Sequence, residues 1–195
     1  PAATLLHLGP GLGNGIANLH NAKKARSPVV NIVGDHARHH LEHDAPLTSD
    51  IIGLARPVSA WVKTSASSTM VGRDGAEAIA SACKPPGQVA TLILPADTAW
   101  NGGGVIGSVP KIPPPEEVED SKVENAAEFI RGTDETLILL GADALMENSL
   151  KTVAKIQAKT GVQILAEGMN ARVQRGAGRL SCLLYTSPSP RDDEL

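Results

Sequence analysis

The chain has 195 residues, of which 42% are hydrophobic and only 2% aromatic, and its formal net charge is −3. This length suits one or two domains with a core of aliphatic side chains. The charge balance disfavours a nucleic-acid surface, and no apolar run is long enough to cross a membrane. We find no secretory signal peptide, and the two cysteines, Cys83 and Cys182, form no CxxC pair. We therefore expect a cytoplasmic protein without nucleic-acid or membrane partners.

Strand-like and helix-like segments alternate over the first hundred residues. Aliphatic and β-branched runs predict strands at residues 2–8, 29–33, 58–62 and 89–94, the first of them buried. Helices are predicted at residues 16–26, 49–55 and 69–83. In the last helix, an apolar stripe faces the core and a polar set faces solvent. The stripe is Val71, Ala76, Ile79, Ala80 and Cys83, and the polar set is Arg73, Asp74 and Glu77. The alternation predicts an α/β fold with a parallel sheet covered by helices.

The composition changes after residue 100. Glycine, proline and acidic residues predict a linker over residues 101–121, between a first domain at 1–100 and the start of a second α/β domain at 122–180. In the second domain, helices are predicted at 123–131 and 145–160, and strands at 136–140 and 162–166. Residues 181–195 resemble the translation of a sequencing-library adapter. We interpret them as a non-native tail and exclude them from fold reasoning.

A glycine-rich run follows the first predicted strand. Gly9, Gly11, Gly13 and Gly15 alternate through a predicted turn, with His7 at its entrance. A turn between a strand and a helix is where α/β proteins bind ligands. A dinucleotide site is one candidate, because Asp35 ends the next strand at a suitable distance, but Ile16 stands where the third glycine of that motif belongs. No phosphate-binding loop is present. Gly11 and Gly13 are expected to allow close backbone approach or a positive φ.

All six histidines lie in the first quarter of the chain: His7, His20, His36, His39, His40 and His43. Their spacing matches no common metal-ligand motif, and we predict no metal site among them. We expect His39 and His40 to lie on a solvated loop.

The glycine run and the segments after it resemble thiamine-diphosphate enzymes of the acetolactate synthase and benzoylformate decarboxylase group. The run from His7 to Asn14 is similar to the T-S-G-P-G-A-T-N turn of the synthases' pyrimidine-binding domain. Further matches follow in order along the chain, at residues 18–22, 28–34, 44–50, 55–58 and 87–97. Residues 170–179 are typical of synthase large subunits. The ordered series covers residues 1–180 and is far more specific than any single motif in it.

The resemblance implies a function and a set of site residues. It implies a 2-oxo-acid decarboxylase or carboligase that uses thiamine diphosphate and Mg²⁺ and is a homodimer or homotetramer at full length. His7 falls where some members carry a catalytic histidine, and its imidazole could move a proton near neutral pH. Pro10, Gly11 and Asn14 fall where the family approaches the aminopyrimidine ring. The alternatives from the residues alone are a loop-capping role for His7, turn geometry for Pro10 and a helix cap for Asn14.

The chain departs from the family pattern in three places. Asp35 and His36 replace a Gly-Gln pair that is common in synthases, which leaves the substrate open. The family's catalytic Glu would precede Pro1, and no G-D-G…N-N motif for the diphosphate and Mg²⁺ occurs, so we expect the main cofactor site to lie outside this chain and the chain alone to be inactive. Dependence on FAD is not readable from this sequence. A dinucleotide-binding oxidoreductase fragment and a cofactor-free α/β interaction module remain alternatives.

Overall fold

The computed structural model describes residues 1–132, 136–168, 170, 172–174 and 176. The chain divides into two compact units, Pro1–Pro115 and Glu116–Leu195. We call them unit 1 and unit 2 and describe each by itself. The tail predicted at 181–195 lies outside the described residues.

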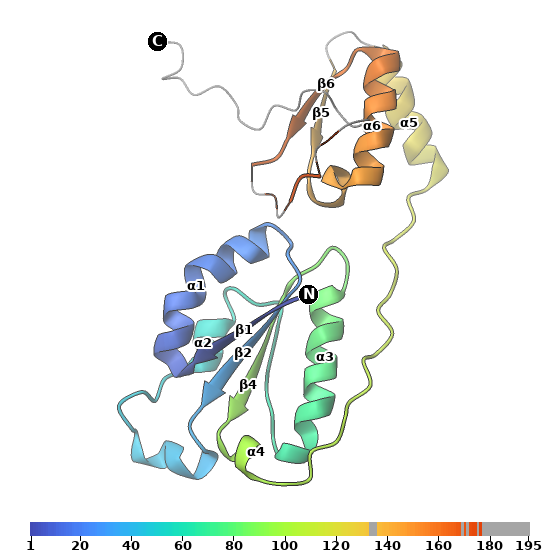
Figure 1. Ribbon diagram of the computed structural model, residues 1–195. Helices are drawn as coiled ribbons and strands as arrows, with labels where there is room; N and C mark the ends of the chain where they lie inside the picture. Colours follow the sequence, from blue (N-terminus) through green and yellow to red (C-terminus); the bar gives the residue numbers. More distant parts are fainter. Residues whose placement is uncertain (133–135, 169, 171, 175, 177–195) are drawn as a thin grey trace, which may run out of the picture. The chain divides into compact units, whose positions relative to one another are not determined.

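Unit 1 is a four-stranded parallel sheet in the order β1-β2-β4-β3, with helices packed on it (Figure 1). This confirms the predicted fold class. The strands are β1 (Ala2–His7), β2 (Val29–Asp35), β3 (Trp61–Thr64) and β4 (Val89–Pro95). The helices are α1 (Leu8–Lys24), α2 (Ile51–Ala55), α3 (Val71–Cys83) and α4 (Asp97–Trp100), with 3-10 helices η1 (Arg38–His43) and η2 (Ser68–Met70).

The two central strands carry core side chains on both faces, as buried parallel strands do. On one face, Val33 and Ile93 pack with Leu12 of α1. On the other face, Val30 and Leu92 pack with alanines of α3. A polar ladder crosses the sheet in register: Thr4 donates to Asn31, Asn31 donates to Thr91, and Thr91 contacts Ser59. Because the buried members of this ladder are paired, their burial carries no unsatisfied-group penalty.

The prediction that the first strand is buried is wrong. β1 forms at the expected place, but it is the edge strand and most of its side chains are exposed. Leu5 is 77% exposed. The reason lies in the tertiary packing. α1 packs against β1, whereas α3 packs against β2, β3 and β4 and does not cover the second face of β1.

The glycine run is not a turn, because α1 begins at Leu8 directly after β1. The residue with the left-handed backbone is Leu8, at φ 55°, whereas Gly11 and Gly13 lie inside the helix and have no positive φ. Gly9 is where close approach matters, because a Cβ there would collide with the side chain of Ser49. Glycine disfavours a helix interior, but burial of Leu12 on the core outweighs that preference.

The predicted strand at 58–62 forms later, at Trp61–Thr64. Val58 instead belongs to a turn after α2, in which its N–H donates to the carbonyl of Ala55. Its side chain is nevertheless buried in the core. The apolar run therefore predicted the burial of Val58 correctly, but not its backbone conformation.

The predicted faces of α3 are wrong at two residues, because Ile79 of the expected core stripe is 37% exposed and Asp74 of the expected solvent face is buried. Asp74 is fully buried, and the buried residues of the helix are Asp74, Ala76, Ala78 and Ala82. Lys63 Nζ lies 2.8 Å from Asp74 Oδ1, and Ser65 Oγ donates to Asp74 Oδ2 at 2.9 Å. Burial acts to raise the pKa of Asp74, but the hydrogen bonds from Lys63 and Ser65 outweigh it and the pKa is lowered. A carboxylate can occupy the core side of this helix because it is fully paired.

We expect Gly72→Ala to destabilise unit 1 and Gly75→Ala to stabilise it. A Cβ on Gly72 would collide with the backbone carbonyl of Val105, which cannot rotate away as a side chain would. Gly75 has open space around it, so alanine there should add about 0.5–1 kcal/mol to helix stability. The measurement is urea unfolding followed by tryptophan fluorescence, because both tryptophans, Trp61 and Trp100, lie in unit 1. Equal effects of the two substitutions would contradict the docking of residue 105 on α3.

Unit 2 contains a two-stranded parallel sheet and two helices within its described residues. Its elements are α5 (Asp120–Gly132), β5 (Leu137–Leu140), the 3-10 helix η3 (Ala142–Leu145), α6 (Glu147–Thr160) and β6 (Gln163–Ala166). Its core contains Leu140, Leu145, Leu150 and Ile164. These elements match the four that were predicted, to within a few residues. α5 begins inside the segment predicted as a linker.

Candidate active site

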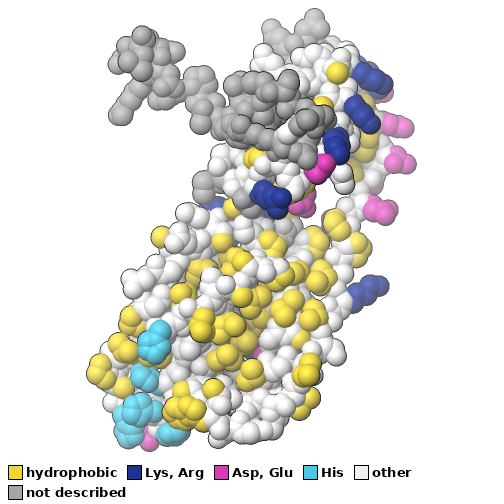
Figure 2. Space-filling view, viewed as in Figure 1, with side chains coloured by type: hydrophobic (Ala, Val, Ile, Leu, Met, Phe, Trp, Pro, Cys, Tyr) yellow, Lys and Arg dark blue, Asp and Glu magenta, His cyan; other side chains and the backbone are white. Residues whose placement is uncertain are grey.

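A cavity of about 660 Å³ lies at the carboxyl ends of β1, β2 and β4 in unit 1. This is the edge of a parallel sheet at which α/β proteins place ligands. Most of its wall is apolar. The lining residues are His7, Leu8, Gly34, Asp35, His36, Ala37, His39, His40, Leu47, Val71, Leu94, Pro95, Ala96, Thr98, Ala99 and Trp100. Figure 2 shows histidine side chains gathered at one edge of unit 1, next to hydrophobic ones.

The structure separates the four residues predicted for the site. His7 ends β1 and lines the cavity, paired in the sheet with Gly34 of β2. Gly11 lies next to it, since a Cβ on Gly11 would be 3.5 Å from His7 Cβ. Pro10 and Asn14 are exposed on α1 and do not line the cavity. The alternative role of Asn14 as a helix cap is wrong, because α1 has already begun at Leu8.

The cavity also takes in histidines that were expected on a solvated loop. His39 and His40 are exposed, but they lie on η1 and line the cavity together with His36. The rings of His36 and His40 are 5.4 Å apart, and those of His40 and His43 are also 5.4 Å apart. Among the described residues, no group of His, Cys, Asp and Glu side chains is arranged to hold a metal ion.

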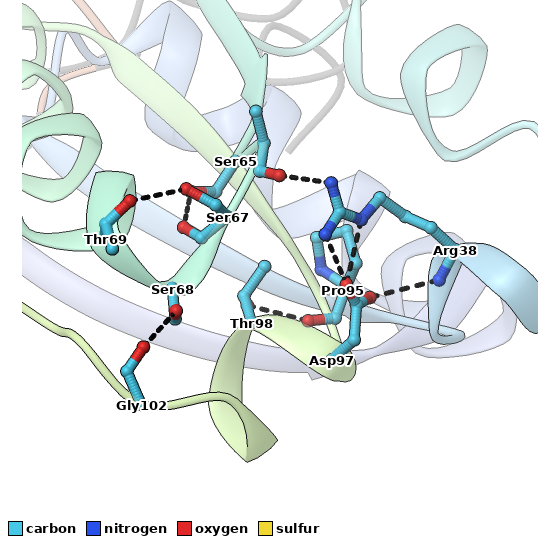
Figure 3. A network of polar contacts seen from close by, with 10 residues as sticks. Arg38, Ser65, Ser67, Ser68, Thr69, Pro95, Asp97, Thr98 and Gly102 are labelled. Atoms are coloured by element: carbon cyan, nitrogen blue, oxygen red, sulfur yellow. Dashed lines mark hydrogen bonds and ion pairs between the residues drawn. The ribbon is translucent and has the colours of Figure 1, made fainter.

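Arg38 ties together the loops that follow three strands. Its side chain forms an ion pair with Asp97, its backbone N–H donates to Asp97 Oδ1 at 3.0 Å, and its guanidinium also donates to the carbonyl of Ala66 (Figure 3). The hydrogen bonds from Arg38 hold the pKa of Asp97 below its usual value, so the carboxylate stays charged at neutral pH. This contact fixes the start of η1, and with it the histidines, against α4.

Sequence reasoning missed this pair. Arg38 and Asp97 are 59 positions apart, and neither belongs to a motif that indicates the other. Asp97 is the last residue of the 87–97 segment that resembles the family. That resemblance indicated where Asp97 lies in the domain, but not that Arg38 is its partner.

Comparison with known proteins supports the resemblance to thiamine-diphosphate enzymes. Residues 1–54 match the model of the thiamine pyrophosphate enzyme N-terminal TPP binding domain. The chain is 44% identical over 178 residues to a candidate acetolactate synthase large subunit, IlvX, of Mycobacterium tuberculosis, covering 91% of this chain and 34% of that protein. Over these stretches the chain is similar to thiamine-diphosphate-dependent enzymes. The matched TPP binding segment contains β1, α1, β2 and the cavity residues from His7 to Leu47.

Solved structures of thiamine-diphosphate-dependent enzymes share the fold. A candidate enzyme of this family from Mycobacterium smegmatis superposes with a TM-score of 0.68 at 21% identity, over 88% of this chain and 34% of that one. The 4-hydroxybenzoylformate decarboxylase of Rhodococcus jostii superposes with a TM-score of 0.71 at 19% identity, over 87% and 33%. The chain thus spans about a third of the length of these relatives. No helix among the described residues is long and apolar enough to cross a membrane.

Proposed function

We propose that this chain is part of a cytoplasmic enzyme that uses thiamine diphosphate and Mg²⁺ to decarboxylate a 2-oxo acid and, in the manner of an acetolactate synthase, joins the product to a second carbonyl compound. The observation that carries this proposal is the cavity at the strand ends, because nine of its sixteen lining residues belong to the matched TPP binding segment and His7 is one of them. We further propose that the full-length protein is a homodimer or homotetramer, since the resemblance puts the cofactor between domains of two subunits.

The cavity fits the aminopyrimidine end of the cofactor. That end is a flat heteroaromatic ring, and the cavity offers apolar walls with the residues His7 and His36 among them. Pro10, Gly11 and Asn14 would approach the ring from the first turns of α1, as the resemblance implies. When bound, the cofactor supplies the electron sink for the carbons of the 2-oxo acid.

The chain's own residues supply position, dryness and proton transfer. The apolar wall formed by residues such as Leu94 and Val71 excludes water, which strengthens electrostatic interactions inside. His7 gives and takes a proton at an imidazole nitrogen, because it ends β1 at the cavity wall. Arg38 and Asp97 hold η1 in place, so the histidines keep their positions on the cavity wall.

The test of the function is turnover. The full-length protein, loaded with thiamine diphosphate and Mg²⁺, is incubated with a panel of 2-oxo acids, and CO₂ release and carbon products are measured. We expect decarboxylation of at least one acid. Absence of decarboxylation for every acid by a folded, cofactor-loaded protein would contradict the proposal.

We also expect the 195-residue chain alone to bind the cofactor weakly and to show no turnover, because it supplies one wall of the site. Calorimetric titration with thiamine diphosphate and Mg²⁺ measures this. A micromolar dissociation constant for the chain would overturn this expectation without affecting the reaction class.

A further inference from the structure

We propose that a second cavity of unit 1 binds a planar aromatic anion, with the ring of the ligand on Trp61 and its charged group at Lys84 and Lys111. The cavity has a volume of about 390 Å³, which lies in the range of small-molecule sites. It lies between the second half of α3, the start of β3 and residues 110–113. No residue that lines it also lines the cavity at the strand ends, so this proposal goes beyond the proposed function and does not depend on it.

Residues 101–113, which we call the strap, form one wall of this cavity. The strap runs along α3 (Figure 1), because the backbone of Val105 passes against that of Gly72 near the start of the helix and residues 110–113 line the cavity near its end. The contact at Gly72 leaves no room for a Cβ, so it determines where the strap crosses the helix. Two prolines in the wall restrict its backbone, which lowers the entropy lost when a ligand orders it.

The strap has few polar contacts of its own. Ser68 Oγ donates to the carbonyl of Gly102 at 2.6 Å, at the beginning of the strap. Over the remaining residues, 103–113, the described part of the chain provides no hydrogen bond and no ion pair. A ligand held by Lys84 on the helix side and by Lys111 on the strap would therefore add the polar contact between these two walls that the chain itself lacks.

The charged groups around this cavity favour an anion. Lys84 and Lys111 are exposed, and neither forms an ion pair among the described residues. Glu77, the acidic residue of the cavity, is already paired with Lys63 at 2.6 Å and with Arg73 at 3.5 Å, so it leaves the other two lysines unneutralised. Since Lys84 follows the negative end of the α3 dipole, an anion there needs the charge of both lysines.

Trp61 supplies a surface for a flat ring. It is half-buried and packs against the core cluster under α3, so its indole is held in place while part of it lines the cavity. Ala80 and Ile112 add apolar surface to the walls. A planar ring gains stacking and apolar contacts here, whereas a bare anion gains only contacts with exposed lysines, which are weak. The cavity therefore favours a ligand that combines a ring with a negative charge.

The experiment measures binding to the whole 195-residue chain with Trp100→Phe, which leaves Trp61 as its one tryptophan. The readout is the NMR signal of the Trp61 indole N–H during titration at pH 7 with 2-naphthoate, 2-naphthyl phosphate, uncharged 2-naphthol or inorganic phosphate. We expect both ring-bearing anions to shift this signal and to bind about fivefold or more tightly than the other two probes. Added salt should weaken the ring-bearing anions and leave 2-naphthol unchanged.

Variants test the lysines and the strap separately. Lys84→Met and Lys111→Met should each weaken 2-naphthoate about threefold or more and leave 2-naphthol unchanged. Lys24→Met is the matched control, because Lys24 is exposed on α1 and does not line the cavity. Gly72→Ala should weaken both ring probes, since its Cβ displaces the strap, whereas Gly75→Ala, with open space around it, should not.

Each contrary result overturns a stated part. Equal affinity for 2-naphthoate and 2-naphthol would refute the anion site, and unchanged binding in both lysine variants would remove the lysines as its ligands. Unchanged binding by folded Gly72→Ala would refute the strap as a wall, and an unmoved Trp61 signal with every probe would refute the site. The tighter of the carboxylate and the phosphate identifies the charged group. No measurement needs cofactor or turnover, so failure here leaves the proposed function untouched.

Discussion

Replacing Asp74 with alanine is expected to lower the free energy of unfolding of unit 1 by about 3 kcal/mol. Asp74 is 1% exposed and is paired with Lys63, Ser65 and Arg73. Removing its carboxylate leaves the buried Ser65 hydroxyl without its closest acceptor and creates a cavity. The measurement is urea unfolding followed by tryptophan fluorescence.

Glu77 provides the matched control on the same helix. It also binds Lys63, at 2.6 Å, but its side chain is 35% exposed, so solvent screens the pair. We expect Glu77→Gln to cost less than about 1 kcal/mol. Similar losses for the two substitutions would show that burial of Asp74 does not determine its contribution.

The direction of the pKa shift predicts how this contribution depends on pH. The pKa of Asp74 lies below 3.8 in the folded chain, so the carboxylate stabilises the fold at pH values above about 4. That stability is lost as the pH falls through the lowered folded pKa. Between about pH 5 and pH 2, the parent chain should therefore lose more stability than Asp74→Ala. Parallel acid unfolding curves would contradict this.

The second large effect is expected at His7, in the full-length, cofactor-loaded enzyme. If the imidazole transfers the substrate proton, His7→Ala should lower kcat by about a hundredfold or more and remove the matching limb of the pH profile. The measurement is kcat over a range of pH with a substrate found in the turnover assay. An unchanged kcat at every pH would make His7 a structural residue that ends β1.

His20→Ala is the control for the loss of a histidine. His20 is exposed on α1 and does not line the cavity. We expect its kcat and pH profile to equal those of the parent enzyme. A comparable loss in both variants would point to a general effect on α1 rather than proton transfer at His7.

Much of the fold was predictable because its signals are local. The run from Val89 to Pro95 is aliphatic almost throughout, and it forms the strand β4, buried between two layers. The alternation of such runs with helical segments was enough to predict the parallel sheet. The segment around His7 likewise predicted a ligand-binding strand end, and a cavity lies there.

The errors have a common physical cause, which is that tertiary contacts override local preference. Glycines 9–15 predicted a turn, yet α1 continues through them because Leu12 is buried on the core. The charge of Asp74 predicted a solvent face, yet Lys63 and Ser65 pair with it inside. A strand is buried by its neighbours as much as by its composition, so β1 is exposed at the sheet edge.

The sequence by itself determined the order of the elements, the α/β class and the family resemblance, because propensity, periodicity and motif order are properties of short segments. Only the tertiary structure decided which side chains share the site. It brought Arg38 to Asp97 across 59 positions and, within the described part of the chain, left His36 Nε2 buried with no hydrogen-bond partner. Such pairings depend on how the sheet aligns distant strand ends, and no local pattern records that alignment.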